Sequence, residues 1–306
     1  GVVTVEEAWA TPPVSVSDLA ALMPGVSRNG DGAWGAELNI RGLSRDSVVM
    51  LLDDVRVNTA TDLGARLGLI DPLDAARVEV LKGPISSLHG SGSIGGVVNV
   101  ISRTGEFSKS PEWKAGASAT WKSNPDGVGG YAFGNYNSPD AFVYVSQSGR
   151  DFDSYEAGGG EEVRNSQFED HGTALRAGYR LSDVWTARVN AQYFAGGDIG
   201  VPGSGTAPLP AAADVTYSDV SRSMVSVANT VEPRGSSLKE SSLLLYQQHI
   251  DRQVEIDRYP PSSTVRTVRP RGVHDTYGGR WMNRLDLDAH TLTAGLDAWQ
   301  RQLEST

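Results

Sequence analysis

The sequence predicts a mainly β protein, in which a small α+β domain over residues 1–110 precedes antiparallel strands of a transmembrane β-barrel over residues 111–306. Three observations predict this fold class. Two short β-branched runs frame a glycine-rich stretch between residues 79 and 102, which is typical of a compact sheet with tight turns. After residue 111, apolar and polar residues alternate with the period of a strand. The connections between these segments are alternately short and long, as they are in barrels that cross a membrane.

The glycine-rich stretch contains the spacing Gly90-x-Gly92-x-x-Gly95, which also occurs in dinucleotide-binding loops. Such a loop needs a strand before the glycines and a helix after them, because the pyrophosphate binds at the helix N-terminus. Here the β-branched run 97–101 follows directly and predicts a strand. We therefore interpret the glycines as positions of tight turns and close backbone packing.

Short sequence blocks follow one another in a fixed order across residues 14–105. They are Pro24-Gly25-Val26 after a short helical pattern, Ile40-Arg41-Gly42, the segment 48–56, Asp71-Pro72, the segment 77–84 and the glycine-rich stretch. This series resembles the plug domain of TonB-dependent outer-membrane receptors. Asp54, Lys82 and His89 stand where that family usually has glycine, arginine and tyrosine, and none of these differences would dismantle a sheet.

Composition restricts the class of protein. The chain has no cysteine, and 27 Lys and Arg residues against 37 Asp and Glu give a net charge of −10, which argues against a nucleic-acid partner. No run of about 18 apolar residues is present, so only strands could cross a membrane. Residues 1–4 lack the basic start and apolar core of a signal peptide, so we expect a mature or trimmed form. The resemblance implies the outer membrane of a Gram-negative bacterium.

The alternation after residue 111 predicts nine strands. In the segment 184–194, apolar residues from Trp185 to Tyr193 share one face, and polar residues from Thr186 to Gln192 share the other, as a lipid-facing and a lumen-facing row would. The same pattern predicts strands over 113–122, 130–137, 140–149, 175–181, 221–232, 238–251, 275–288 and 290–303.

The predicted connections sort by length. Short turns are expected at 138–139, 182–183, 233–235 and 289, a medium turn at 123–129, and long loops at 150–166, 197–220 and 252–274. Short turns on one side and long loops on the other indicate periplasmic turns and extracellular loops. A soluble β-sandwich is the alternative, but it has no reason to sort its connections this way.

Aromatic residues lie near the predicted strand ends: Trp113, Trp121, Tyr136, Trp185, Tyr193, Trp281 and Trp299. Interfacial girdles and ordinary packing both explain this position. Nine strands do not close a barrel whose lumen holds a plug, which needs about 22 strands. We therefore expect the remaining barrel segment or a second polypeptide to complete the wall and to pair with the strand at 290–303.

The resemblance implies a receptor for the energised uptake of a scarce metal chelate, most often a ferric siderophore or haem. A cobalamin receptor, or a plugged barrel with a structural or adhesion role, is the alternative. The implied partners are outer-membrane lipid and TonB with its ExbB/ExbD energising complex, which pulls a short N-terminal segment at or before residues 1–5 by strand addition. No catalytic motif is present, so we predict no enzyme and no required cofactor.

The resemblance also suggests ligand-binding positions on the outward loops of the plug, which are Asp31, Trp34, Asp62 and Arg66. Trp34 offers a flat apolar face and Arg66 a cation for an anionic chelate, although exposed turn residues would look the same. Arg41 and Lys82 match plug positions whose cations pair with carboxylates on the barrel wall. We expect this pairing to act as a latch, with its glutamate partners beyond residue 306.

The predicted loop 150–166 clusters acidic residues, and Asp151, Asp153 and Glu156 are weak candidates for calcium ligands. The cluster lacks the ordered spacing of an EF-hand, so a solvated acidic loop is favoured. Five histidines are scattered without the spacing of a zinc motif, although one that faced an outer vestibule could ligate haem iron.

Overall fold

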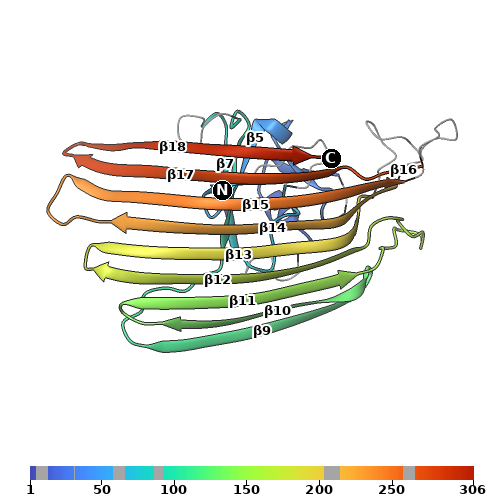
Figure 1. Cartoon of the computed structure of the whole chain (residues 1–306), viewed down its shortest axis with the longest axis horizontal. Coiled ribbons are helices and arrows are strands. Elements are labelled where there is room, and N and C mark those ends of the chain that lie inside the picture. The colour runs from blue at the N-terminus through green and yellow to red at the C-terminus, as the bar shows by residue number, and fades with distance from the viewer. Residues whose placement is uncertain (5–12, 31, 58–65, 86–91, 203–213, 258–265) are drawn as a thin grey trace.

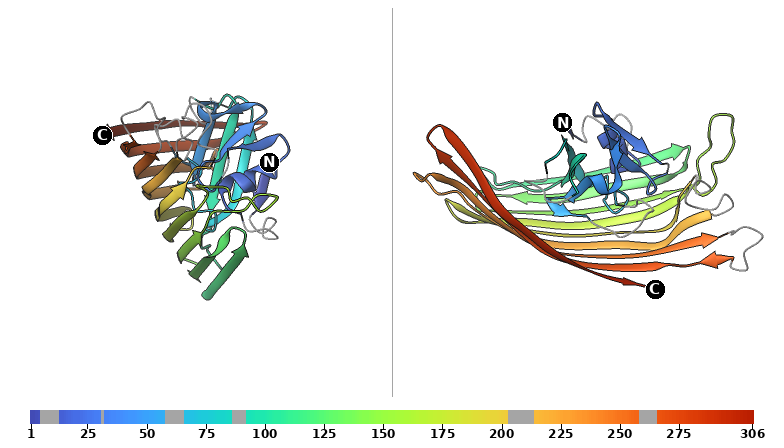
Figure 2. Two further views of the ribbon diagram at one scale, coloured as in Figure 1. Left: turned by 90° about the vertical axis from the view of Figure 1, so that its right-hand side faces the viewer. Right: turned by 90° about the horizontal axis from the view of Figure 1, so that it is seen from above.

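A computed structural model describes residues 1–4, 13–30, 32–57, 66–85, 92–202, 214–257 and 266–306. A small unit built from the first hundred or so residues lies against the concave side of a large curved sheet (Figures 1 and 2). Among the described residues, no helix is long and apolar enough to cross a membrane. The predicted division at residue 110 falls between the last strand of the small unit and the first strand of the sheet.

The small unit, called the plug below, combines one short helix with two small sheets. Strands β1 (Val2–Thr4), β7 (Ala75–Lys82), β8 (Gly96–Ser102), β5 (Val48–Leu52) and β6 (Val55–Arg56) form one sheet in this order, and β2 (Val26–Asn29), β3 (Glu37–Ile40) and β4 (Leu43–Ser44) form the other. Helix α2 spans Val16–Ala21, and a 3-10 turn, η1, spans Arg45–Ser47. The carboxylate of Asp18 accepts the backbone N–H of Ser15 at 3.0 Å, which satisfies one donor at the helix start.

The glycine-rich stretch leads into a strand, as the β-branched run predicts. Strand β8 begins at Gly96, whose φ of +150° disfavours a side chain. A Cβ atom there would lie 2.3 Å from the carbonyl oxygen of Leu81 on β7. The glycine is therefore required because two strands approach closely, and the dinucleotide interpretation is excluded by the strand that follows.

The large sheet, called the wall below, consists of long antiparallel strands. They are β9 (Glu112–Ser123), β10 (Asp126–Asn137), β11 (Ala141–Phe152), β12 (Phe168–Ser182), β13 (Trp185–Gly200), β14 (Asp214–Val231), β15 (Leu238–Asp257), β17 (Arg271–Leu287) and β18 (His290–Ser305). Each pairs with its neighbour in the chain, and the short β16 (Thr267–Val268) adds to β15. The nine predicted strands are confirmed, and both β9 and β18 are edges of the described sheet.

The strands extend beyond the predicted boundaries. The medium turn expected at 123–129 is a tight connection at 124–125, and the strands continue several residues into each predicted long loop. The reason is that the outward apolar row stops while backbone pairing continues. On β14, for example, the outward row changes from the apolar Val225 to Ser221 and Asp219 toward the long connection, yet both of these residues remain paired with β15. Alternation therefore marks the membrane-facing part of a strand and not its whole length.

The outward row of the wall is apolar and exposed, as predicted. Trp113 and Trp121 are 80% and 69% exposed at opposite ends of β9. Trp299 differs from the girdle interpretation, because it shares the inner face of β18 and the guanidinium of Arg56 lies 5.7 Å from its ring centroid. This tryptophan therefore lies beside a plug cation, and that contact is not visible in the sequence.

Candidate functional site

The interface between plug and wall holds a buried ion pair between Asp74 of the plug and Arg176 of β12. The Arg176 Nη2 donates to Asp74 Oδ2 at 2.5 Å, and Nη1 lies 3.3 Å from Oδ1. Tyr131 and Ser146 donate their hydroxyl groups to the same Oδ1 at 3.0 and 2.9 Å. Because Asp74 is only 7% exposed, these contacts replace the water that the carboxylate loses on docking.

A second plug carboxylate, Asp71, lies beside the first. Its Oδ2 accepts the Ser148 hydroxyl at 2.5 Å, and its Oδ1 accepts the backbone N–H of Leu73 at 2.9 Å. Burial, and next the charge of Asp74, raises the pKa of Asp71 to about 6. Two carboxylates therefore share one interface, and the second of them is held in a costly charged form at neutral pH.

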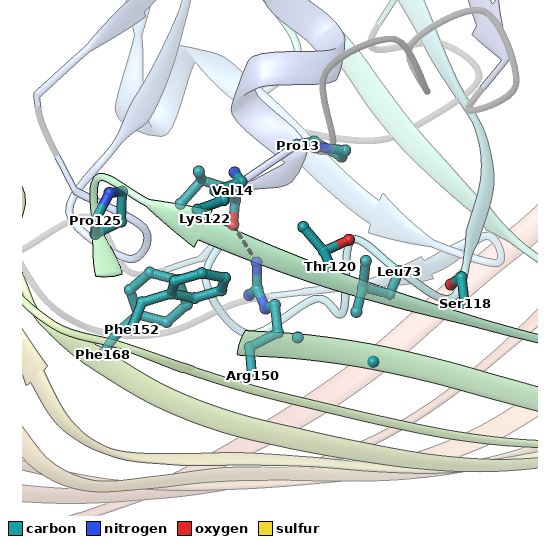
Figure 3. A pocket seen from close by; sticks show the side chains of 12 residues that line it. Pro13, Val14, Leu73, Ser118, Thr120, Lys122, Pro125, Arg150, Phe152 and Phe168 are labelled. Carbon is teal, nitrogen blue, oxygen red and sulfur yellow. Dashed lines mark hydrogen bonds between the residues drawn. The ribbon is translucent and has the colours of Figure 1, made fainter. Parts of the chain in front are cut away.

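Near the long β11–β12 connection, Arg150 of β11 joins the wall to the plug. This guanidinium binds Asp170 of β12 through Nε–Oδ1 and Nη2–Oδ2 distances of 2.9 and 2.5 Å. Its Nη1 donates to the main-chain oxygen of Val14 in the plug at 2.5 Å, as Figure 3 shows. The ring of Phe168 lies under the guanidinium, with 4.9 Å between Cζ and the ring centroid. Arg150 thus fastens the segment just before α2 to the wall.

Asp53 forms a third contact region near the ends of the strands that are joined by short turns. It occupies a tight β5–β6 turn with φ of +49°, and its carboxylate accepts the backbone N–H and the hydroxyl of Ser102, both at 2.8 Å. Asn190 and Gln192 of β13 donate side-chain amides to the same carboxylate at 2.9 and 2.8 Å. Here the plug is joined to the wall through uncharged donors.

Several wall side chains bind main-chain oxygens of the plug. Arg222 of β14 donates from Nε to the Leu69 oxygen at 2.8 Å, and Arg176 donates to the Arg103 oxygen at 2.7 Å. Gln248 of β15 donates to the Arg56 oxygen at 3.2 Å. Together with the contact of Arg150 to Val14, these bonds fix the path of the plug backbone against the wall.

The charges at this interface are arranged opposite to the predicted latch. Plug carboxylates meet wall arginines, whereas the sequence predicted plug cations and wall carboxylates. Arg41 is exposed and donates only its backbone N–H, to Gly25, and the ammonium group of Lys82 donates to the Pro24 oxygen. Neither forms an ion pair with a described residue, so their pairing with carboxylates elsewhere stays a prediction.

The predicted ligand-binding loop residues are placed differently from one another. Trp34 is 1% exposed: its ring stacks on Phe194 at 5.6 Å between centroids, and its Nε1 lies 3.4 Å from Asp170 Oδ2. Its flat face is therefore used for packing the plug on the wall and is not open to a ligand. The Arg66 side chain is 16% exposed and lies 4.0 Å from Glu37. Asp31 and Asp62 lie outside the described residues.

The calcium candidates Asp151, Asp153 and Glu156 are exposed around the β11–β12 connection. Asn124 clamps this connection, because its side chain accepts the Glu156 N–H and donates to the Glu156 oxygen, each at 2.8 Å. Within the described ranges, no three His, Cys, Asp or Glu residues are grouped so that they could hold a metal ion. The geometry gives the calcium prediction no support.

Sequence reasoning missed the carboxylates Asp53, Asp71 and Asp74 and the functional importance of Arg150 and Arg222. A signal for them exists. An arginine in the inward row of a barrel strand needs a counter-charge or carbonyl on whatever fills the lumen. The sequence shows such arginines, but it does not show which plug residues face them.

A plug held by buried polar contacts against one side of a curved antiparallel wall defines a plugged outer-membrane barrel. Residues 1–97 match the family described as TonB-dependent Receptor Plug Domain. Residues 1–97 therefore form a plug domain of the TonB-dependent receptor kind, and the whole chain shares its fold with solved receptors that are β-barrel proteins of the Gram-negative outer membrane.

Two curated relatives illustrate the sequence similarity. A hemin receptor of Yersinia enterocolitica is 25% identical over 98% of this chain and 44% of its own length. A vitamin B12 transporter, BtuB, of Vibrio vulnificus (strain CMCP6) is 30% identical over 61% of this chain and 28% of its own length. The chain thus spans less than half the length of these relatives.

Solved structures share the fold. The copper transporter OprC superimposes with a TM-score of 0.84 at 16% identity, over 100% of this chain and 46% of that one. The FrpB iron transporter from Neisseria meningitidis gives a TM-score of 0.78 at 17% identity, over 99% and 49% of the two chains. At these identities the likeness concerns the fold alone.

Proposed function

We propose that the protein takes up a scarce metal chelate across the outer membrane in an energised step, with a ferric siderophore or haem as the cargo. The observation that carries the proposal is the plug itself, which is bound to the wall by the buried ion pair Asp74–Arg176 and by the hydrogen bonds of Arg150, Arg222 and Asp53. A plug held this firmly does not leave room for a chelate by thermal motion alone, because buried charges would lose their partners. Work must therefore be supplied from outside the molecule.

The place where work enters is the N-terminal edge of the plug. Strand β1 pairs with β7 over only Val2–Thr4, and the terminal amine of Gly1 donates to the Val80 oxygen at 2.8 Å. TonB with ExbB/ExbD would pull a segment at or before this edge by strand addition. Short pairing at an edge lets the pull begin with few hydrogen bonds.

Two further parts of the proposal concern the rest of the receptor. The remaining barrel segment or a second polypeptide would pair with β18, whose residues are all exposed along the strand. That part of the wall would also supply carboxylates for Arg41 and Lys82, which lie on plug surface that the described wall does not neutralise. Arg66, on the partly exposed side of the plug, remains a candidate for contact with the cargo.

Uptake experiments test the proposal. Cells that carry the receptor, with and without TonB, are given radiolabelled ferric aerobactin, ferric enterobactin, haemin or cyanocobalamin. We expect TonB-dependent accumulation of an iron compound. Accumulation of cyanocobalamin alone would instead favour the cobalamin alternative. The similarity to the vitamin B12 transporter BtuB is the reason for testing it. If none of these compounds binds or accumulates, a structural or adhesion role replaces uptake.

A further inference from the structure

The inner face of the wall carries a series of arginines. Each long strand from β11 to β17 places at least one on this face: Arg150, Arg176, Arg188, Arg222, Arg252 and Arg280, with Arg180 and Arg284 as second arginines on β12 and β17. They occur at different heights, from Arg150 near the long connections to Arg188 and Arg280 nearer the short ones. Because the chain as a whole has a net charge of −10, this run of cations is a local feature of the lumen and not a consequence of composition.

The arginines nearer the short connections line a hollow between the plug and the wall. Its volume is about 620 Å³, and its wall includes Arg176, Arg188 and Arg280 together with Asp53 and Asp54 of the plug. Other lining residues lie at strand ends next to the short turns, such as Thr230, Glu240 and Thr293. The hollow is therefore at the periplasmic end of the lumen, where a cargo would leave the barrel.

In the resting state, plug carboxylates lie beside two of these arginines, and wall carboxylates also approach two: Asp170 pairs with Arg150, and Asp297 lies 3.9 Å from Arg280. Asp74 binds Arg176, and the carboxylate of Asp54 lies 3.6 Å from the guanidinium of Arg280. Arg188 is different, because it is exposed and its guanidinium carbon lies 5.7 Å from the centroid of the Phe107 ring. In the middle, Arg222 is 1% exposed and its Nη1 has no hydrogen-bond partner among the described residues. The arginines thus range from neutralised to open.

We propose that these arginines form a path for a negatively charged chelate, and that Asp54 and Asp74 act as built-in counter-anions that hold the path closed. This inference rests on the proposed uptake function and adds a cargo class and an exit site to it. When TonB remodels the plug, Asp54 and Asp74 are withdrawn from Arg280 and Arg176. Arg176 is then left without its carboxylate, and Arg280 keeps only Asp297 of β18, so an anionic cargo replaces the plug carboxylates and a neutral or cationic one does not.

The charge on Arg188 gives a direct uptake test, because this residue lines the hollow without pairing with a plug carboxylate. The probe is radiolabelled ferric enterobactin, a ferric catecholate of net negative charge. For Arg188→Gln we expect surface binding to stay within about twofold of the unaltered receptor and energised uptake to fall about tenfold, the loss of one charge-assisted contact. Arg188→Lys should restore most of the uptake.

The matched control is Arg271→Gln. Arg271 is an exposed arginine on β17 that pairs with Asp251, a residue on the outer face of the wall. This variant should leave both binding and uptake unchanged. Equal uptake by Arg188→Gln and the unaltered receptor would overturn the proposal, and so would an Arg188→Lys variant as defective as Arg188→Gln, because the effect would then not be one of charge.

A second measurement needs no cargo. The purified receptor in a planar bilayer is treated with urea to displace the plug, and the reversal potential is measured in a KCl gradient. We expect Arg188→Gln and Arg280→Gln to shift selectivity toward K⁺, and Asp54→Asn to leave it unchanged because Asp54 has left Arg280. An opposite shift in Asp54→Asn would mean that the carboxylate stays in place, and the proposal would fail.

The two measurements separate the inference from the function on which it rests. If ferric enterobactin, ferric aerobactin and haemin are not taken up by any form, the proposed function is wrong, and the KCl measurement still decides whether the arginines form an anion path. If an iron chelate is taken up but neither arginine variant changes uptake or selectivity, the function stands and the path does not exist.

Discussion

At the scale of single residues, the decisive feature is that the plug presents carboxylates to a wall of arginines. Asp74 and Arg176 are both nearly inaccessible, and a buried pair of this kind contributes little net stability but is expensive to break. The pair therefore specifies where the plug sits more than it strengthens the protein. The carboxylate of Asp71 accepts the Leu73 N–H at 2.9 Å. It adds a second negative charge, which burial and the neighbouring Asp74 make unfavourable.

Replacing Asp74 with asparagine should weaken plug docking. Arg176 would remain buried without its anion, and we expect a loss of about 3–5 kcal/mol at the interface. Asp251→Asn, which removes an exposed outer pair with Arg271, should cost at most about 1 kcal/mol. Limited proteolysis of the plug in the purified receptor distinguishes the two variants. Equal protection in both would show that the buried pair has no role in docking.

The raised pKa of Asp71 predicts a pH dependence. Its pKa is about 6 in the folded protein and about 4 in an unfolded chain, so the folded state binds the proton more readily between these values. The contribution of Asp71 to stability is therefore present below pH 4 and is lost as the pH rises through 6. Asp71→Asn should gain about 3 kcal/mol at pH 7 and almost nothing at pH 4. Thermal unfolding measured at both pH values gives the difference directly, and a pH-independent difference would refute the assignment.

At the scale of strands and turns, the sequence predicts the strand segments that face lipid. Nine wall strands could be identified because lipid on one side and a polar lumen on the other impose alternation. Their ends next to the long connections could not, since the outward side chains there are polar while inward ones such as Val215 and Val254 pack against the plug, which reverses the alternation. The surroundings of Trp34 and Trp299 could not be predicted for a related reason. An aromatic residue at a loop or strand end has the same local pattern whether it faces lipid, solvent or the plug.

The candidate site was less predictable than the fold. Arg176 belongs to a polar row that the sequence displays, but its partner Asp74 is 102 residues away, and no local pattern connects them. Arg41 and Lys82 were identified by resemblance, and the resemblance carries no information about the reversed charge arrangement on this side of the plug. Pairings between the plug and the wall depend on how the two parts dock, and no periodic signal in the sequence reports that docking.

The close approach of β7 and β8 gives a prediction at this scale. Gly96→Ala places a methyl group 2.3 Å from the Leu81 oxygen at a φ of +150°, so β8 must shift, and we expect a loss of about 2–4 kcal/mol. Gly134→Ala on β10 is the control, since nothing lies within 4 Å of its added Cβ and the change should be neutral within about 1 kcal/mol. Thermal unfolding of both variants tests this, and equal melting temperatures would contradict it.

At the scale of the whole molecule, charge is separated across the wall. The inner face carries the arginines, whereas several strands turn carboxylates outward beyond the apolar band: Asp151, Glu169, Asp219, Asp251 and Asp275. The net charge of −10 is that of the whole chain, so it conceals the cations of the inner face, where carboxylates such as Asp74, Asp170 and Asp297 are also present. Because inward arginines and outward carboxylates are summed in the net charge, composition alone does not indicate the charge of the cargo.

The open edge of the wall makes a prediction about the chain by itself. Every residue of β18 is exposed, and Leu296 is 71% exposed in its outward row. Expressed alone and refolded in detergent, residues 1–306 should form oligomers through this edge. Co-refolding with the rest of the wall should yield a single compact species on size-exclusion chromatography. A monodisperse monomer of the chain alone would show that β18 needs no partner.

The bonds from Arg150, Arg176, Arg222 and Gln248 to carbonyl oxygens of the plug have an evolutionary consequence. A carbonyl oxygen is present whichever amino acid occupies the position, so these bonds survive substitution of Val14, Leu69 or Arg103 in a way that a side-chain pair does not. Drift in the plug sequence can then proceed while its docking is preserved. Among homologues, we expect these four wall residues to vary less than the plug positions whose backbone they hold, and correlated substitution to concentrate on pairs such as Asp74 with Arg176.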